Sequence, residues 1–250
     1  MAALAAWITP DWPVPPNVRS TCTTRDGGVS QGRYDSLNLG DHVGDEATLV
    51  GQNRAIFERA IGARPVYMKQ VHGTAGVVRL DGHAEDGVEG DGCWSSVRGV
   101  ACTIMVADCL PVLFAADDGS RVGAAHAGWR GLAGGIVEAT VHAMGVPPSS
   151  LLAWLGPCIG PLAFEVGPEV KAAFDARDPA ASAHFKPHGE GKWLADLPAL
   201  TRHRLVRLGV TRLHGNDGST AWCTVSNPSR FFSHRRDRVS GRLAASVWLA

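Results

Sequence analysis

The sequence lacks the short motifs that mark the commonest nucleotide and metal enzymes. It contains no P-loop, no GxGxxG dinucleotide fingerprint, no HExxH and no CxxC pair. These absences exclude P-loop NTPases, Rossmann dehydrogenases, HExxH zinc proteases and the deaminases whose zinc is held by a CxxC pair. Any catalytic site must therefore be assembled from residues that lie far apart along the chain.

The chain also has no net charge and no long hydrophobic run. Its 250 residues carry 24 Lys and Arg against 24 Asp and Glu, so no overall field favours nucleic acid or an anionic membrane. Residues 1–16 show no basic segment followed by an apolar core, and we expect a cytoplasmic protein. The apolar run 100–116 is interrupted by Asp108 and Pro111 and falls short of the roughly 20 residues of a membrane span, which indicates buried strands.

Disulfides are not expected. A chain of 250 residues that is 45% hydrophobic can bury a core without them. We therefore expect free thiols, most of them acting as small buried side chains. The six cysteines are Cys22, Cys93, Cys102, Cys109, Cys158 and Cys223.

The hydrophobic pattern predicts one mixed α+β domain over residues 1–250, with an extended N-terminal segment at 1–17. No internal repeat is present, and a monomer is expected. Strands are expected at 18–24, 66–70, 76–79, 100–107, 112–115, 122–126, 151–155, 212–214 and 244–249. Helices are expected at 48–61, 132–144, 168–175 and 196–208. The pattern does not give the order of the strands in a sheet.

A GxSxG match occurs at residues 28–32, in the string GVSQG. A nucleophile elbow needs a buried strand before the serine and a helix after it. The surroundings, TTRDGGVSQGRYDSLN, are polar and rich in turn residues. We interpret the match as a chance occurrence in a loop.

Three residues of catalytic type stand at the ends of apolar segments. Cys109 lies between two of them and two residues before Pro111, His126 opens a glycine-rich turn, and His72 precedes Gly73. Each alone is compatible with a packed thiol or a hydrogen-bonded structural histidine. Together they form a donor set suited to a catalytic zinc ion, which takes three protein ligands and keeps one position open. Their spacing matches no local metal motif.

Seven strings stand out in the sequence, namely TTRDGGVS, SLNLGDHVGD, KQVHG, VADCLPVLF, AAHAGWRGLAGGI, GPCIGPLAFEVGPEV and NPSRFFSHRRDRVSGRLAASVWLA. Together they resemble the YfiH/YlmD-type family over residues 19–250. That family was first labelled multicopper polyphenol oxidase or laccase-domain protein and is now understood as purine nucleoside phosphorylase. Its fold, mixed sheets flanked by helices, has been grouped with toxin cysteine hydrolases.

The resemblance implies a zinc enzyme. It implies that His72, Cys109 and His126 are the metal ligands and take part in catalysis. The implied reaction splits a purine nucleoside with inorganic phosphate into the free base and ribose 1-phosphate. Adenosine, inosine and guanosine are the implied substrates, with methylthioadenosine as a further candidate, and deamination of adenosine to inosine is a second implied activity.

Side chains for substrate and proton transfer are less clearly marked. For phosphate we select Arg25 in the polar glycine loop, with Lys69 and Arg130 behind it, although each also fits a surface cation. Asp108 fits three roles: it could orient a ligand histidine, serve as a general acid or base, or bond the backbone of a turn. Phe231 is selected as a face for the purine, with a core position as the alternative.

Other residues of the C-terminal segment, and one acidic residue, complete the candidates. The segment SNPSRFFSHRRD also offers Ser226, Asn227 and Arg235 as pocket residues. Asp91 precedes Gly92, Cys93 and Trp94, where an acidic strand start like ADA is expected from the family. This departure leaves the role of Asp91 open.

Three other functions fit parts of the sequence. A copper oxidase needs many histidines, and ten are present without any HxH pair, so zinc is favoured over copper. A cysteine hydrolase, including one that edits peptidoglycan precursors, would use Cys109 as nucleophile with His126 or His72 as base. A zinc-stabilised scaffold would need a fourth ligand, which Cys102, Cys158 or Cys223 could supply.

Overall fold

The computed structural model describes residues 7–74 and 76–250. The first six residues of the expected N-terminal segment lie outside the described part. The strands are β1 Val18–Cys22, β2 Arg64–Tyr67, β3 Val77–Arg79, β4 Gly92–Ser95, β5 Val100–Val106, β6 Leu110–Ala116, β7 Val122–Ala127, β8 Leu151–Leu155, β9 Glu165–Val166, β10 Phe185–His188, β11 Lys192–Ala195, β12 Arg212–Gly215 and β13 Leu243–Leu249. The helices are α1 Ala47–Ile61, α2 Trp129–Gly134, α3 Ile136–Met144, α4 Pro168–Asp175, α5 Leu197–Leu208 and α6 His234–Asp237. Short 3-10 turns occur at Gly32–Tyr34, Pro148–Ser150, Pro179–His184 and Thr220–Trp222.

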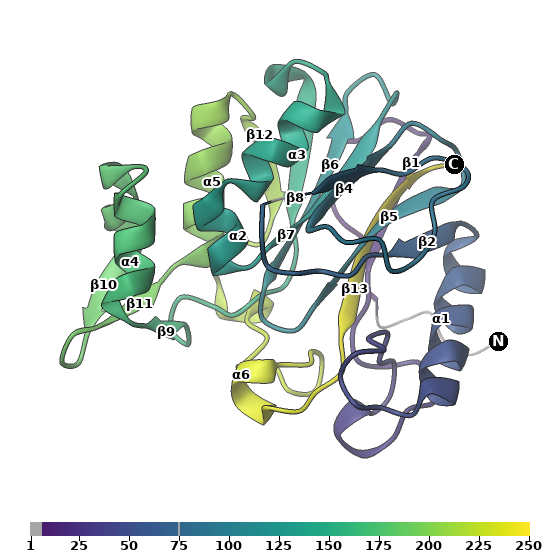
Figure 1. The fold of residues 1–250 in the computed structure, drawn as a ribbon, viewed down its shortest axis with the longest axis horizontal. Helices are drawn as coiled ribbons and strands as arrows, with labels where there is room; N and C mark the ends of the chain where they lie inside the picture. Colours follow the sequence, from purple (N-terminus) through teal and green to yellow (C-terminus); the bar gives the residue numbers. More distant parts are fainter. Residues whose placement is uncertain (1–6, 75) are drawn as a thin grey trace.

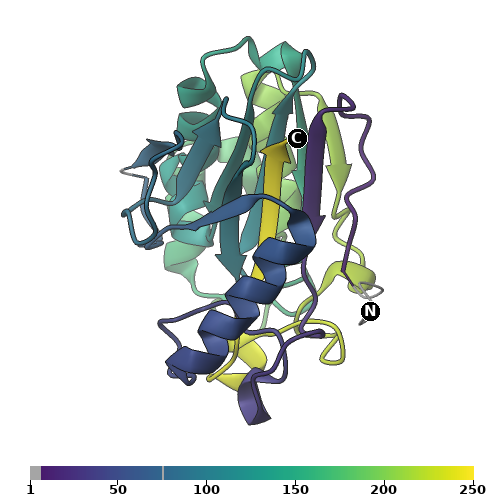
Figure 2. The ribbon, with the colours of Figure 1, turned by 90° about the vertical axis from the view of Figure 1, so that its right-hand side faces the viewer.

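Two large mixed sheets stack against each other, and helices cover their outer faces (Figure 1). One sheet has six strands in the order β12-β8-β6-β7-β4-β3, and the other has four in the order β1-β13-β5-β2. Figure 2 shows α1 crossing the outer face of the four-stranded sheet. Helices α2, α3 and α5 lie on the far side of the six-stranded sheet (Figure 1). The predicted mixed α+β domain is confirmed.

The central strands are apolar throughout because both of their faces are covered. On β6, Leu110, Val112 and Phe114 pack in the core beneath the helices. Leu113 and Ala115 alternate with them and join the core between the two sheets. Successive side chains of a strand point to opposite faces, so a strand buried on both sides loses the polar alternation of a surface strand.

The antiparallel pairing of β6 with β7 fixes where two of the predicted site residues meet. In this pair, Leu110 lies opposite Ala127 and Pro111 opposite His126. The start of β6 therefore stands beside the end of β7, at one edge of the sheet. Cys109 and His126, which are 17 positions apart in the sequence, are brought to the same place by one hairpin.

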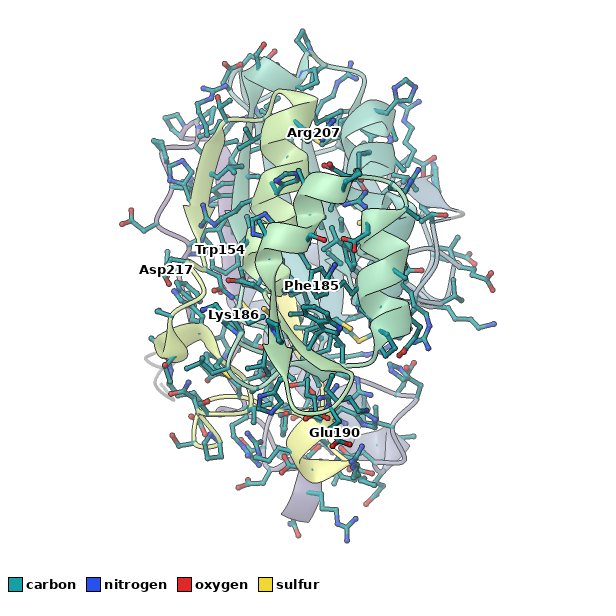
Figure 3. The ribbon with its side chains drawn as sticks, turned by 90° about the vertical axis from the view of Figure 1, so that its left-hand side faces the viewer. Trp154, Phe185, Lys186, Glu190, Arg207 and Asp217 are labelled. Atoms are coloured by element: carbon teal, nitrogen blue, oxygen red, sulfur yellow. The ribbon has the colours of Figure 1, made fainter. Side chains whose placement is uncertain are left out.

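Three parts of the fold differ from the prediction. The expected helix 132–144 begins earlier, at Trp129, and is broken at Gly135, whose φ of 104° is left-handed. Strand β4 was not predicted, and it carries the altered segment after Asp91. Strands β9, β10 and β11 form a small sheet that was not predicted. Figure 3 shows its hairpin, with Lys186 on one strand and Glu190 at the turn.

No helix in the described ranges is both long enough and apolar enough to cross a membrane.

The loop containing the GxSxG match is held by one buried asparagine. Asn53 of α1 accepts the backbone N–H of Val29 at 2.8 Å. Its amide donates to the Ser30 hydroxyl at 2.9 Å and to the Asn38 carbonyl at 2.9 Å. Ser30 in turn donates to Asp45 at 2.6 Å. Ser30 is therefore a structural residue of a loop, in agreement with the sequence interpretation.

Replacing Asn53 should destabilise the protein. Asn53→Ala removes the acceptor of the Val29 N–H and leaves the Ser30 hydroxyl and the Asn38 carbonyl without the buried amide donor of Asn53, so we expect the free energy of unfolding to fall by roughly 1–3 kcal/mol. Gln52→Ala, at the exposed neighbouring position of the same helix, should change it by less than about 0.5 kcal/mol. Urea unfolding followed by circular dichroism measures both. Equal effects of the two substitutions would contradict the assigned role of Asn53.

Candidate metal centre and active site

The three predicted metal ligands lie together. Cys109 immediately precedes β6, His126 is the penultimate residue of β7, and His72 comes from the loop after β2. One ring nitrogen from each histidine and the Cys109 sulfur all lie within 4.8 Å of one another. The rings of His72 and His126 meet edge to face, with centroids 4.7 Å apart. This is the one group of three or more potential metal ligands among residues 7–74 and 76–250.

Asp91 holds both histidines of the candidate metal site. Its carboxylate accepts the ring Nδ1 of His126 at 2.8 Å and the backbone N–H of His72 at 3.0 Å. It also accepts the N–H groups of Val71 at 3.2 Å and Gly73 at 2.8 Å. A carboxylate bonded to the second ring nitrogen fixes the tautomer and orientation of a metal-ligating histidine. The residue placed to orient His126 is therefore Asp91, rather than Asp108 as one of the sequence alternatives proposed.

Asp108 is used to connect chain segments. Its carboxylate accepts the Thr224 hydroxyl at 2.6 Å and the backbone N–H of Arg235 at 2.6 Å. Its carbonyl accepts the N–H of Ile159 at 2.9 Å. These bonds tie the start of β6 to the loops that contain Ile159 and Thr224 and to helix α6, which is the turn role considered from the sequence. Its role as a general acid or base stays a prediction.

Gly128 leaves the space that the ligands occupy. A Cβ atom at this position would lie 2.9 Å from the Cys109 sulfur and 3.3 Å from Cδ2 of the His72 ring. Its φ of −66° is open to any residue, so the constraint is the close approach alone. This explains why glycine follows the HA of the HAGWRG string.

Without a metal ion, the opposite charges of Cys109, His126 and Asp91 stabilise one another. Burial opposes ionisation of Cys109, yet His126 and His72 lower its pKa from 9.0 to about 6. Burial would likewise lower the pKa of His126, but the Cys109 thiolate and Asp91 raise it to about 9. Burial would raise the pKa of Asp91, and hydrogen bonds from His126, Gly73 and His72 hold it below its ordinary value. At neutral pH the site is thus a thiolate beside an imidazolium.

The donor set fits a zinc ion. Two imidazoles and a thiolate are ligands that zinc prefers, and three protein ligands are typical of a catalytic rather than a structural site. The thiolate is already favoured at neutral pH, so binding a cation need not expel a proton from Cys109. Cys102, Cys158 and Cys223 do not join the group. Within the described residues, the fourth cysteine ligand of a closed structural site is therefore not found.

A cavity of about 390 Å³ opens beside the three ligands. Apolar and aromatic side chains line part of it, among them Trp129, Ile159 and Phe164. Four arginines line it as well, from α2, α6 and the approach to β13. The full lining is His42, Gln70, His72, Met105, Val106, Ala107, Asp108, Cys109, His126, Trp129, Arg130, Ile159, Phe164, Leu197, His234, Arg235, Arg238 and Arg242.

Of the predicted substrate residues, Arg130 and Arg235 line the cavity, whereas Arg25, Lys69 and Phe231 do not. The Arg25 guanidinium bonds the carbonyls of Asp35 and Pro228, at 2.8 Å each, and lines a separate pocket. Lys69 is exposed and pairs with Glu89. Phe231 is completely buried in the core between the sheets. The two cations and the aromatic residue thus have structural contacts of the kind that the sequence analysis gave as alternatives, a surface cation and a core position.

Ser226 and Asn227 also lie outside the cavity lining. The Ser226 hydroxyl donates to the Cys223 sulfur at 3.3 Å, and Asn227 donates to the carbonyls of Thr220 and Cys223. Sequence reasoning also missed Arg238 and Arg242. Their signal was the density of arginine in SRFFSHRRDRVSGR, which holds five between Arg230 and Arg242.

Comparisons with known proteins agree over nearly the whole chain. A family model described as multi-copper polyphenol oxidoreductase laccase matches residues 19–250. A Pseudomonas aeruginosa protein named purine nucleoside phosphorylase is 51% identical over 245 residues, covering 98% of each chain. The Escherichia coli protein named purine nucleoside phosphorylase YfiH is 47% identical over 97% of this chain and 98% of its own. The crystal structure of YlmD from Geobacillus stearothermophilus aligns with a TM-score of 0.91 and 30% identity, over 100% of this chain and 98% of that one.

Alkylation should reveal the lowered pKa of Cys109. Only a thiolate reacts with iodoacetamide, so after chelator treatment the Cys109 rate should rise through a midpoint near pH 6 and then level off. Buried Cys22, whose pKa burial raises to about 12, should stay unmodified. Peptide mass spectrometry separates the two sites, and added zinc should protect Cys109. A midpoint near pH 9 would contradict the charge arrangement described above.

Asp91→Asn should weaken metal binding. The amide keeps the shape of the carboxylate but removes its charge and presents donors to His126 and to the loop N–H groups. Loss of such a partner typically costs 10–100-fold in metal affinity, which is the expected change here. Competition with a chromogenic chelator measures the affinity. Glu89→Gln, at an exposed position two residues away, is the matched control, and an affinity of Asp91→Asn within twofold of it would remove Asp91 from the site.

Proposed function

Because the chain belongs to the family described as multi-copper polyphenol oxidoreductase laccase, with curated relatives named purine nucleoside phosphorylases, we propose that it splits purine nucleosides with inorganic phosphate. The resemblance to YfiH and YlmD proteins predicted from the sequence is confirmed. The proposed substrates are adenosine, inosine and guanosine, with methylthioadenosine as a further candidate. The proposed cofactor is one zinc ion held by His72, Cys109 and His126.

The observation that carries the proposal is the composition of the cavity. Trp129 and Phe164 supply aromatic faces suited to a purine ring. Four arginines supply donors suited to phosphate oxygens. The metal ligands lie in the same cavity, so a base, a phosphate and a Lewis acid would share one space. This combination suits phosphorolysis, in which the base and the phosphate must bind side by side at the ribose.

The reaction transfers a ribosyl group from the purine nitrogen to a phosphate oxygen. A bond forms between C1′ of the ribose and the phosphate, and the electron pair of the glycosidic bond leaves with the base. The arginines would bind the attacking phosphate and hold it oriented towards C1′. The apolar wall would hold the base and exclude water, which would otherwise compete with phosphate. A bound zinc ion would supply Lewis acidity within the cavity.

Deamination of adenosine to inosine is proposed as a second activity of the same site. It consumes one water molecule at C6 and releases ammonia, so it needs a group that accepts and returns a proton. Asp108, His42 and His234 are the cavity residues of suitable type besides the ligands. The two activities are separated by their need for phosphate.

The free site also favours a second candidate, a cysteine hydrolase. The Cys109 thiolate, the His126 imidazolium and the Asp91 carboxylate follow the order nucleophile, base and orienting acid. Metal content distinguishes the two functions, because the phosphorylase proposal uses the Cys109 sulfur as a zinc ligand, whereas the hydrolase proposal uses it as a free nucleophile. Peptidoglycan precursors remain the substrates to test for this alternative.

Copper oxidase chemistry receives less support. Several coppers need several histidine clusters, and one group of ligands is present in the described part of the chain. Met105 does line the cavity, as an axial ligand of a blue-copper site would. Copper is therefore measured together with zinc in the test below.

The test is product analysis with adenosine, with and without phosphate, on protein of known zinc and copper content. Adenine and ribose 1-phosphate should form only with phosphate, and inosine should form without it. Cys109→Ala should lose the zinc and at least about 100-fold of both rates, because a metal ligand is removed. Cys223→Ser is the matched control and should keep zinc and activity, since its hydroxyl can accept the bonds from Gly160 and Ser226.

Absence of all products in protein holding one zinc per chain would reject the nucleoside assignment. Phenol oxidation that follows copper content would instead favour the oxidase. Hydrolysis that persists in zinc-free protein and is lost in Cys109→Ala would favour the cysteine hydrolase.

A further inference from the structure

Backbone strain converges on one cavity. Three non-glycine residues in the described chain have a left-handed φ: His72 at 60°, Asp108 at 94° and Arg238 at 63°. All three line the cavity beside the metal ligands. Such conformations cost free energy and persist where the surrounding structure enforces them, often at functional sites. The left-handed φ of His72 and of Asp108 can be explained by the proposed metal site, because His72 is a proposed ligand and Asp108 precedes the ligand Cys109. Arg238 is adjacent in sequence to no proposed ligand, so its left-handed φ needs another explanation.

The turn that carries Arg238 is firmly built. The N–H of Arg238 donates to the His234 carbonyl at 2.8 Å and closes the short helix α6. The neighbouring Arg236 grips Asp237 through two bonds, at 2.8 and 2.7 Å, and donates to the carbonyls of Thr224 and Phe231. Arg236 therefore fixes the turn. The Arg238 guanidinium takes no part in these bonds, and Arg238 lines the cavity.

The positive charges of the cavity are poorly neutralised. The Asp237 carboxylate is paired with Arg236, and both carboxylate oxygens of Asp108 already accept hydrogen bonds. Within residues 7–74 and 76–250, no hydrogen bond or ion pair involves the side chain of Arg238. Arg242 donates from Nη1 alone, to Ser240 and the Gly241 carbonyl, which leaves Nη2 and Nε. Two guanidinium groups with spare donors thus line the same space.

We infer that Arg238 and Arg242 hold the inorganic phosphate in the cavity, an inference that rests on the proposed function. Guanidinium donors are arranged as a fork that matches two phosphate oxygens at once. Arg242 is half-buried and anchored by its carbonyl contacts, so it is the fixed partner. Arg238 is exposed and completes the site from the solvent side. The strained backbone is what presents this side chain to the anion.

A second basic pocket is the competing location. It is lined by Arg25, Arg33 and Arg236 and contains no metal ligand. Arg25 already donates hydrogen bonds to two backbone carbonyls, and Arg236 already donates to backbone carbonyls and to Asp237. Phosphate bound there would lie outside the cavity that contains Cys109. The two locations give opposite results in the experiment below.

Arg238→Gly tests the inference without endangering the fold. Glycine adopts a φ of 63° without strain, so the melting temperature should stay equal or rise. In zinc-loaded protein we expect the KM for phosphate to rise at least tenfold, while the KM for the nucleoside and the zinc content stay within twofold. Arg238→Lys should recover part of the loss. Arg33→Ala removes an equal charge from the second pocket and should leave all values unchanged.

Titration calorimetry with inorganic phosphate on the zinc-loaded proteins separates the two levels of the argument. Weaker phosphate binding in Arg238→Gly, with wild-type binding in Arg33→Ala, supports the inference even if no nucleoside is split. Unchanged binding or an unchanged phosphate KM in Arg238→Gly overturns it, and a loss confined to Arg33→Ala moves the site to the second pocket. Failure of phosphorolysis with normal phosphate binding rejects the proposed function and leaves the anion site in place.

Discussion

The site depends on the carboxylate of Asp91, which is 1% exposed and accepts four hydrogen bonds. Three of the donors are backbone N–H groups of the turn that carries His72, and the fourth is the ring of His126. A buried carboxylate is stable only when it is well bonded, and a turn that directs three successive N–H groups to one place is suited to bind an anion. Each requirement is met by the other. The pairing of β4 with β7 sets the distance, because the Asp91 carbonyl also accepts the His126 N–H at 2.7 Å.

The charge distribution gives the cavity a character that the whole chain does not have. The net charge is zero, yet four arginines gather around one cavity whose single carboxylate, on Asp108, already accepts two hydrogen bonds. Other acidic residues near these arginines are paired elsewhere, as Asp237 is with Arg236. A low-dielectric cleft lined by one sign of charge concentrates counter-ions far more than the net charge suggests. A sequence with no net charge can therefore still contain a strong local anion site.

The sequence predicted the parts of the site whose signals are local. Cys109 and His126 could be recognised because each interrupts an apolar strand end next to proline or glycine. Asp91 could not be assigned, because its partners are 18 to 35 positions away and β4 is too short to be read from its pattern. The positions of Phe231 and Arg25 outside the cavity lining could not be predicted for a related reason: an aromatic or a cation in a loop is equally suited to a core, a carbonyl cluster or a ligand. Long-range pairing decides among these outcomes, and periodicity contains no information about it.

Cys109 and His126 are suited both to binding a metal ion and to cysteine nucleophile chemistry. The reason is electrostatic. A thiolate at neutral pH needs a neighbouring positive charge, which can be an imidazolium or a metal ion. In the first case His126 keeps its ring proton and Cys109 is a nucleophile; in the second His126 gives up the proton and both residues become ligands. Asp91 stabilises either form through the opposite ring nitrogen. A site that combines Cys109, His126 and Asp91 can therefore support either metal-dependent chemistry or a cysteine nucleophile, and its affinity for the cation decides between them.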